Sequence, residues 1–145
     1  MREHDLPAHL IVPEGFAISN SRGGFSNHNG PVYEASAADD PRSGFFVLDR
    51  HCNSMGFLHG GMASAFADRS LARAVWAETG RASVTLKLTL HFLETVRLHK
   101  WLEAHPTVIS FEHDLVQVTA DLRIDGDKLA ARADATFRTL RRQQK

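Results

Sequence analysis

The second half of the chain alternates apolar and polar residues with a period of two, the spacing at which strand side chains share a face. The alternation covers residues 83–92, 115–124 and 129–140. In the first stretch, one face is expected to carry only apolar side chains: Val84, Leu86, Leu88, Leu90 and Phe92. The pattern predicts half-buried strands of an antiparallel sheet, with one face on the core and one in solvent.

Further apolar runs predict three more strands, at residues 31–35, 44–48 and 101–111. The last of these contains Pro106, which indicates a bulge or a sheet edge because proline has no N–H to donate. Asp125-Gly126 predicts a two-residue hairpin turn between the last two long strands.

Residues 1–30 lack such a pattern and are interpreted as an N-terminal arm and loop. Residues 6–12 are compatible with a short helix or an arm, and residues 19–30 consist of turn-forming residue types. We assign residues 31–145 to one domain, because no linker or internal repeat divides them.

One helix is expected, over residues 58–79, because this segment is rich in Ala, Leu and Met and lacks proline. Gly80 follows it, as glycine often follows a helix C-terminus. Apart from a stripe formed by Arg69 and Arg73, which we interpret as solvated or as a subunit contact, apolar residues lie on nearly every side. This predicts a buried helix and an α+β fold in which the antiparallel sheet wraps around it.

Asp68 stands out on this helix because no cation lies on its own face within one turn. An unpaired buried carboxylate is unfavourable, so it indicates either a partner or chemistry. At the helix start, Gly60 and Gly61 offer backbone N–H groups at the positive end of the helix dipole. Such donors can stabilise a carbonyl oxygen that becomes negative.

The composition restricts the partners. With 17 basic and 17 acidic residues the formal charge is zero, which argues against binding to nucleic acid or to a membrane surface. The single cysteine, Cys52, cannot form an internal disulfide, and the N-terminal residues contain no apolar leader, so we expect a cytoplasmic protein. Nine histidines occur without His-Glu-x-x-His or Cys-x-x-Cys spacing, so no metal site is expected.

The motif Asn53-x5-His59-Gly60-Gly61-x6-Asp68, followed by four long strands, resembles the hotdog-fold acyl-CoA thioesterases of the PaaI type, the phenylacetate-pathway branch. The resemblance covers residues 44–140 in element order. Ser83 also falls where such proteins often carry Ser or Thr. The strand that begins there departs from the family pattern, because Thr85 and Lys87 replace its usual polar residues and its closing proline is missing.

The resemblance implies hydrolysis of acyl-CoA thioesters and a role for each motif residue. Asp68 would be the general base or the nucleophile, while Asn53 and the Gly60 N–H would polarise the thioester carbonyl. His59 would hold the loop and help to place the substrate, and Ser83 would orient the water or the carboxylate. The site would lie at a dimer interface, in a homodimer or a homotetramer built as a dimer of dimers. Coenzyme A would be part of the substrate, and no separate cofactor is implied.

For substrate binding, the candidates beyond the catalytic residues are Gly61, Phe57, Phe66 and Arg138. The two phenylalanines, with Trp76 and Phe92, are equally suited to an apolar or aryl pocket and to a core. Arg138, with Arg141 and Arg142, forms a basic cluster suited to the phosphates of coenzyme A.

Two other functions on the same fold stay open, since a fold does not determine function. One is a non-catalytic module that binds or senses acyl-CoA, although no DNA-binding segment accompanies it. The other is a hotdog hydratase or dehydratase that acts on 3-hydroxyacyl thioesters. A thiol nucleophile formed by Cys52 and His51 is disfavoured, because adjacent residues seldom direct both side chains to one point.

Overall fold

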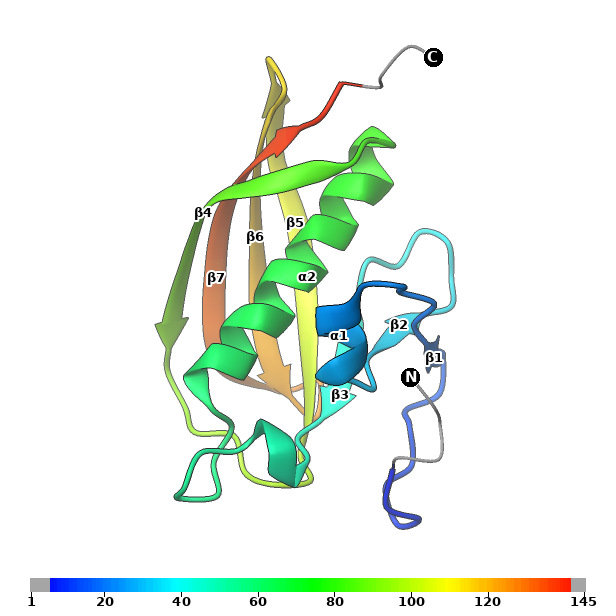
Figure 1. Cartoon of the computed structure of the whole chain (residues 1–145), viewed down its shortest axis with the longest axis vertical. Helices are drawn as coiled ribbons and strands as arrows, with labels where there is room; N and C mark the ends of the chain where they lie inside the picture. The colour runs from blue at the N-terminus through cyan, green and yellow to red at the C-terminus, as the bar shows by residue number, and fades with distance from the viewer. Residues whose placement is uncertain (1–5, 142–145) are drawn as a thin grey trace.

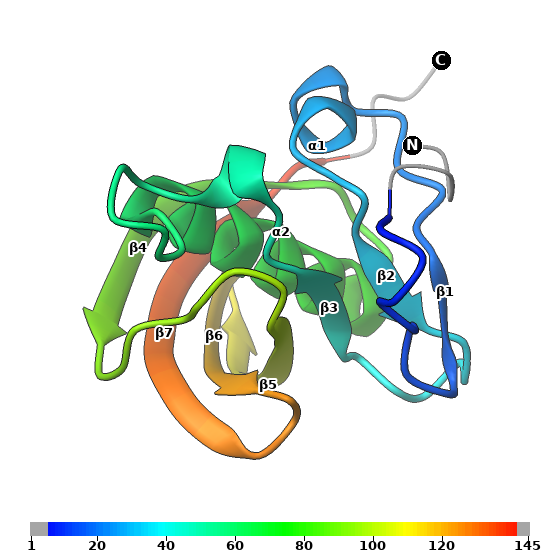
Figure 2. The same ribbon diagram turned by 90° about the horizontal axis from the view of Figure 1, so that it is seen from below.

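A computed structural model describes residues 6–141 and shows one curved antiparallel sheet with a long helix in its concave face (Figures 1 and 2). The helix is α2, Gly60–Thr79, and it ends at Gly80, which adopts the left-handed conformation. The long strands that follow it are β4 Ser83–Phe92, β5 Trp101–Glu112, β6 Leu115–Ile124 and β7 Lys128–Thr139. The shorter elements before it are β1 Phe16–Ile18, α1 Gly24–His28, β2 Tyr33–Ala35, β3 Ser43–Phe46 and the 3-10 turn η2 Asp49–His51.

The strands lie in the order β1-β2-β3-β5-β6-β7-β4, and every pairing is antiparallel. One helix in an antiparallel sheet is the α+β hotdog fold expected from the sequence. β4 follows α2 directly in the chain but lies at the edge of the sheet, where its one neighbour among residues 6–141 is β7, so its other edge is free there. An unpaired strand edge is a template for another strand, which becomes important for the site below.

The main core lies between α2 and the inner face of the sheet. Phe66, Leu71 and Val75 on the helix pack against apolar residues of β5, β6 and β7. The helix is less enclosed than its composition suggested, because Trp76 is exposed on the side away from this core. The apolar residues on nearly every side of the helix predicted that it is buried all round. In the structure, only the face toward the sheet is buried in this way.

A second apolar cluster involves the N-terminal segment, which packs against the other side of β3 and β5. Trp101 is at its centre, and Phe16 and Phe46 approach it edge-on with ring centroids at 5.3 and 5.0 Å. Gly44 is needed here, because a Cβ at that position would lie 2.1 Å from the Trp101 ring. Of the two alternatives for residues 6–12, a short helix or an arm, the structure shows no helix, and the sequence missed strand β1 and, within the loop 19–30, helix α1. The domain boundary at residue 30 stays a prediction.

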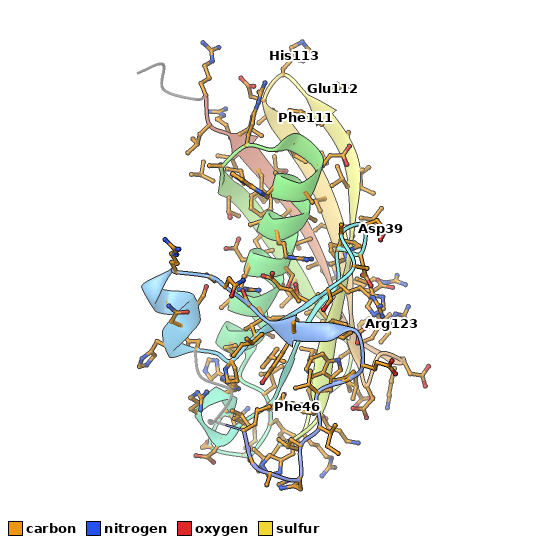
Figure 3. The ribbon with its side chains drawn as sticks, turned by 90° about the vertical axis from the view of Figure 1, so that its right-hand side faces the viewer. Asp39, Phe46, Phe111, Glu112, His113 and Arg123 are labelled. Atoms are coloured by element: carbon orange, nitrogen blue, oxygen red, sulfur yellow. The ribbon has the colours of Figure 1, made fainter. Side chains whose placement is uncertain are left out.

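The hairpin of β5 and β6 extends past the short strands, and Phe111, Glu112 and His113 lie at its tip, far from Phe46 (Figure 3). Pairing of β5 with β3 ends at Ala104, so Pro106 lies where β5 has a neighbour only in β6. The lack of an N–H at Pro106 is tolerated there, as predicted, and a bulge follows between Val108 and Ser110. The predicted turn at Asp125-Gly126 is confirmed, with positive φ at both residues.

A bulge also interrupts β4 between Thr85 and Lys87, and it changes which side chains face the helix. Before the bulge, Thr85 is opposite Phe137, and after it Leu88 is opposite Ala135, both inward-facing residues of β7. Residues directly opposite each other share a face of the sheet, so Thr85 faces inward. The prediction of one uninterrupted apolar face from Val84 to Phe92 is therefore wrong, because one inserted residue reverses the alternation.

Candidate active site

In the first turn of α2, the backbone N–H groups of Gly60 and Met62 have no partner among residues 6–141, and of the two only Gly60 lines the cavity described below. His59 is the N-cap, and its Nδ1 accepts a hydrogen bond from the Gly61 N–H at 2.8 Å. A Cβ at Gly61 would lie 2.9 Å from this Nδ1, so glycine is what permits the cap. The Gly60 N–H has no partner among residues 6–141 and lies at the positive end of the helix dipole.

The loop before the helix is organised by Asn53. Its Oδ1 accepts hydrogen bonds from the backbone N–H groups of Met55 and Phe57, at 3.0 and 3.2 Å. Its backbone N–H donates to the Phe57 carbonyl at 2.8 Å. The side-chain Nδ2 has no hydrogen-bond partner in the described part of the chain, so the loop leaves one donor of Asn53 available to a ligand.

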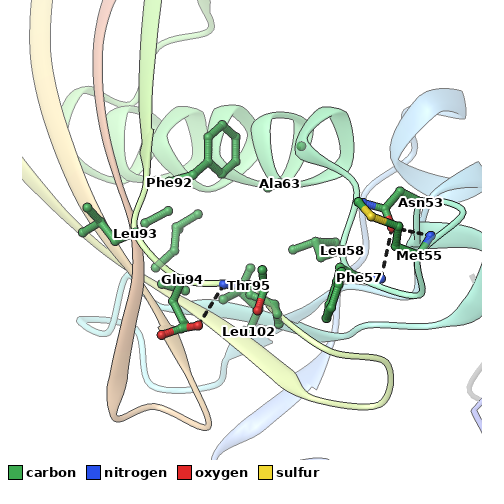
Figure 4. A pocket seen from close by; sticks show the side chains of 15 residues that line it. Asn53, Met55, Phe57, Leu58, Ala63, Phe92, Leu93, Glu94, Thr95 and Leu102 are labelled. Carbon is green, nitrogen blue, oxygen red and sulfur yellow. Dashed lines mark hydrogen bonds between the residues drawn. The ribbon is translucent and has the colours of Figure 1, made fainter.

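A cavity of about 530 Å³ opens beside these two donors (Figure 4). It is bounded by the loop 53–58, the start of α2, the segment 92–96 and the inner face of the sheet, and almost all of its lining is apolar. The ring of Phe92 lies at its mouth, 3.5 Å from where a Cβ of Gly60 would be. An apolar wall next to a free N–H strengthens any hydrogen bond formed there.

Asp68 lies elsewhere, two turns along α2, and does not line the cavity. It is eight positions beyond Gly60 on the helix, which corresponds to about 12 Å along the axis. Asp68 is partly exposed rather than buried, and its Oδ1 accepts a hydrogen bond from Thr85 Oγ1 at 2.6 Å. No ion pair to Asp68 occurs within residues 6–141, so its charge has a neutral partner only.

The other residues predicted for the site lie in different parts of the structure. Phe57 lines the cavity, whereas Phe66 is buried in the core against Phe45, with ring centroids at 4.7 Å. Ser83 precedes Thr85 by two positions on β4, opposite Thr139, and it is Thr85 that bonds to Asp68. Phe66 is thus a core residue here, and Thr85, which the sequence analysis noted only as a departure from the family pattern, is the residue that contacts Asp68.

Arg138 is exposed on the outer face of β7, opposite Val84 and at the far end of that strand from the cavity. Arg141 lines a separate polar cleft with Arg81, and Arg142 lies outside the described residues. The structure therefore places Arg138 and Arg141 away from the cavity within one subunit.

The helix arginines differ from the interpretation as a solvated stripe. Arg69 Nη2 is 2.9 Å from Glu34 Oε1, and Arg73 Nε is 3.4 Å from Glu34 Oε2. Burial lowers the pKa of the Arg69 guanidinium, and the Glu34 charge opposes that shift. The pair joins α2 to β2, so these residues stabilise the fold within the subunit.

Cys52 and His51 do not form a nucleophilic pair. The Cys52 thiol donates to the Leu48 carbonyl at 3.4 Å, and burial raises the pKa of this thiol. His51 is buried: its Nδ1 accepts from the Leu48 N–H at 3.0 Å, and its Nε2 donates to the Asn29 carbonyl at 2.7 Å. Both side chains stabilise the turn before the site.

Among the described residues, no group of three or more His, Cys, Asp or Glu side chains is placed to hold a metal ion. Across the same residues, no helix is both long and apolar enough to cross a membrane.

Comparison with known proteins gives a consistent result. The thioesterase superfamily model matches residues 55–131, just over half of the chain. The Pseudomonas aeruginosa protein named "Putative esterase PA0474" is 35% identical over 144 residues, which cover 88% of this chain and 97% of that protein.

Solved structures show the same fold at low identity. The E. coli PaaI protein from the phenylacetic acid degradation operon has a TM-score of 0.73 and 18% identity, over 83% of this chain and 86% of its own. The smu.793 protein of Streptococcus mutans, solved bound to acetyl CoA, has a TM-score of 0.66 and 21% identity, over 71% and 82%. These matches confirm the hotdog fold.

Proposed function

The chain belongs to the thioesterase superfamily, and on this premise we propose that it hydrolyses acyl-CoA thioesters at a site shared by two subunits. The observation that carries the proposal is the separation of two half-sites. The free Gly60 N–H and the cavity lie near the Phe92 end of β4, whereas Asp68 and Thr85 lie near its Ser83 end. Neither half-site alone contains both a carbonyl-polarising donor and an acid.

A second copy of the chain can complete each half-site. β4 is the free edge of the sheet, and Val84, Leu86 and Phe92 on it are large apolar residues with substantial exposure. If two β4 edges pair antiparallel about a twofold axis near the strand centre, the Phe92 end of one lies beside the Ser83 end of the other. Asp68 of each subunit then approaches the cavity of its partner. A tetramer of two such dimers stays a prediction.

The proposed chemistry follows from these groups. The thioester carbonyl oxygen accepts hydrogen bonds from the Gly60 N–H and Asn53 Nδ2, which stabilise the negative charge that develops on it. His59 maintains this geometry by capping the helix through Gly61. The acyl group occupies the apolar cavity, and the thiol portion extends outward.

Asp68 drives the attack on the carbonyl carbon of the thioester, in one of two ways. As a general base it takes a proton from a water molecule, whose oxygen bonds to the carbonyl carbon. As a nucleophile, its carboxylate forms that bond itself and water then hydrolyses the anhydride. In either case the carbon–sulfur bond breaks, and the thiolate leaves as coenzyme A after it takes a proton. Thr85 fixes one carboxylate oxygen, so that the other is free to react.

The test is a thiol-release assay on a panel of acyl-CoAs, with wild type and Asp68→Ala. We expect thiol release by wild type and a loss of turnover of roughly 100-fold or more in the variant, the usual scale for a general base. Oligomer size and thermal midpoint should be nearly unchanged, because Asp68 is partly exposed and, within the described part of the chain, has one hydrogen-bond partner. Acyl-CoA binding without thiol release would instead support a non-catalytic binding module.

A further inference from the structure

The part of the sheet that lines the cavity includes two small residues, Ala130 and Ala131, which we call the notch. In the cross-strand register, Ala131 of β7 lies between Phe92 of β4 and Leu122 of β6. All three line the cavity, so a single methyl group lies between the exposed ring of Phe92 at the mouth and the buried side chain of Leu122. Ala130, next to an irregularity in the β6–β7 pairing, also lines the space.

The helix side of the cavity, opposite the notch, is also lined by a small side chain. Ala63 is the residue of α2 that lines the cavity one turn beyond Gly60. Cores usually alternate large and small residues so that opposing layers interdigitate. Here the small residues of helix and sheet line one space, which leaves a slot that leads inward from the carbonyl-polarising donors.

The charges around the cavity restrict what can enter it. Among the described residues, Glu94 is the one ionisable residue in the lining, and its carboxylate is bound by Lys128 Nζ at 2.9 Å and by the Thr95 N–H at 3.2 Å. Figure 4 shows this carboxylate turned away from the middle of the cavity. The Arg97 guanidinium stacks over the ring of Phe57 at 5.6 Å but is not part of the lining. An acyl group with its own carboxylate would therefore find no cation inside.

We infer that the slot binds a neutral apolar acyl group larger than acetyl, either alkyl or aryl, and that Ala131 sets its depth. The inference rests on the proposed function in one respect, that the acyl group arrives as a coenzyme A thioester. A volume of about 530 Å³ is within the range of small-molecule sites and far exceeds what an acetyl group fills. Apolar contacts with Leu102, Leu122 and Phe92 then favour longer or aromatic groups.

The chain offers a matched pair of variants for the test. Ala131 and Ala135 lie on the same face of β7 and are buried to the same degree, 4% and 5% exposed. Ala131 lines the cavity and Ala135 does not. Ala131→Val and Ala135→Val therefore add the same two methyl groups to the same layer, and their thermal midpoints show whether both fold.

The measurement is kcat/KM on acetyl-, hexanoyl-, phenylacetyl- and succinyl-CoA for wild type and both variants. We expect wild type to prefer hexanoyl or phenylacetyl over acetyl and succinyl by at least tenfold. Ala131→Val should lower the hexanoyl-to-acetyl ratio by about tenfold or more, while Ala135→Val leaves that ratio unchanged. The relative rates on hexanoyl- and phenylacetyl-CoA distinguish an alkyl from an aryl preference.

Binding separates this inference from the proposed function. Dissociation constants of the same acyl groups, carried on non-hydrolysable thioether analogues of the CoA esters, should follow the same order in wild type and shift in Ala131→Val. If the analogues bind in this order but no ester is hydrolysed, the slot stands and the proposed hydrolysis fails. Equal affinity for acetyl and hexanoyl analogues, or an equal effect of both valine variants, would overturn the inference.

Discussion

Thr85 on β4 donates a hydrogen bond to Asp68 on α2, with 2.6 Å between Oγ1 and Oδ1. The bond exists because the bulge between Thr85 and Lys87 turns Thr85 toward the helix instead of toward solvent. Threonine is a neutral donor, so it orients the carboxylate without neutralising it. A cation in the same place would lower the basicity that the proposed reaction needs.

We expect Thr85→Val to act through Asp68 alone. Valine keeps the shape and β-branching of threonine but cannot donate, so the carboxylate loses its fixed orientation. kcat should fall by roughly tenfold, with KM nearly unchanged because Thr85 lies outside the cavity. Steady-state kinetics on one good acyl-CoA measure both constants.

Thr85→Ser is the control for this prediction, because it retains the hydroxyl and should restore most of kcat. A Val variant with wild-type kcat would remove Thr85 from the mechanism. A Ser variant as impaired as the Val variant would indicate that packing, and not the hydrogen bond, is what matters.

Asn53→Asp separates the two functions of the Asn53 side chain. Aspartate retains an oxygen that can accept from the N–H groups of Met55 and Phe57, so the loop should persist. It replaces the Nδ2 donor with a negative charge where the carbonyl oxygen develops its own. Turnover should drop by roughly 100-fold or more, with little change in thermal midpoint. Turnover near that of wild type would restrict Asn53 to a structural role.

The free edge of β4 predicts that two subunits form a dimer through this strand. Leu86 lies at the bulge on this edge and is 50% exposed. Leu86→Glu should weaken the dimer by roughly 100-fold in dissociation constant, because a charge would have to lose its water at the interface. Sedimentation at several concentrations measures this, and activity should fall with the dimer. Ile109→Glu, at an exposed position on β5 away from this edge, is the control and should leave the dimer intact.

His51 makes stability depend on pH. Burial lowers the pKa of this imidazole below its ordinary value of 6.5, so the unfolded chain binds the proton more tightly than the folded one. The stabilisation is complete above pH 6.5 and is lost as the pH falls below that value toward the folded-state pKa. Protonation of Nδ1 also removes the acceptor of the Leu48 N–H.

Urea midpoints at pH 7.5 and pH 5.5 test this linkage, with His51→Gln as the variant that lacks the titrating group. Wild type should lose more stability than His51→Gln between the two pH values, because only wild type has a buried imidazole whose pKa is lowered by folding. Equal losses would show that other groups govern the acid sensitivity.

The strong periodic signals in the sequence predicted most of the fold. β4, β6, β7 and α2 have the expected positions because alternation and helix propensity agree over ten or more residues there. β1 and α1 were missed because three and five residues are too short for a period to be visible. Their formation depends on tertiary contacts, such as that of Phe16 with Trp101.

The site was only partly predictable for a related reason. The motif indicated the loop, the helix start and Asp68, since these lie close together in sequence. The contact of Thr85 with Asp68 was missed because the residues around the bulge alternate without a fault, and the inserted residue becomes visible only from pairing with β7. Likewise, Ala131 and Ala135 are equivalent in the sequence pattern, and the loop 53–58 and the segment 92–96 determine which of them lines a cavity.

Hybrid dimers test the shared site most directly. Subunits carrying Asp68→Ala and subunits carrying Asn53→Asp are each nearly inactive alone, and they are mixed under conditions that exchange subunits. In a mixed dimer, one site combines an intact Asn53 with an intact Asp68 from the other chain. The shared-site mechanism predicts recovery of about a quarter of wild-type thiol release at equal mixing. If the mixture exchanges subunits and thiol release stays at the level of the separate variants, each site lies within one chain and the mechanism is contradicted.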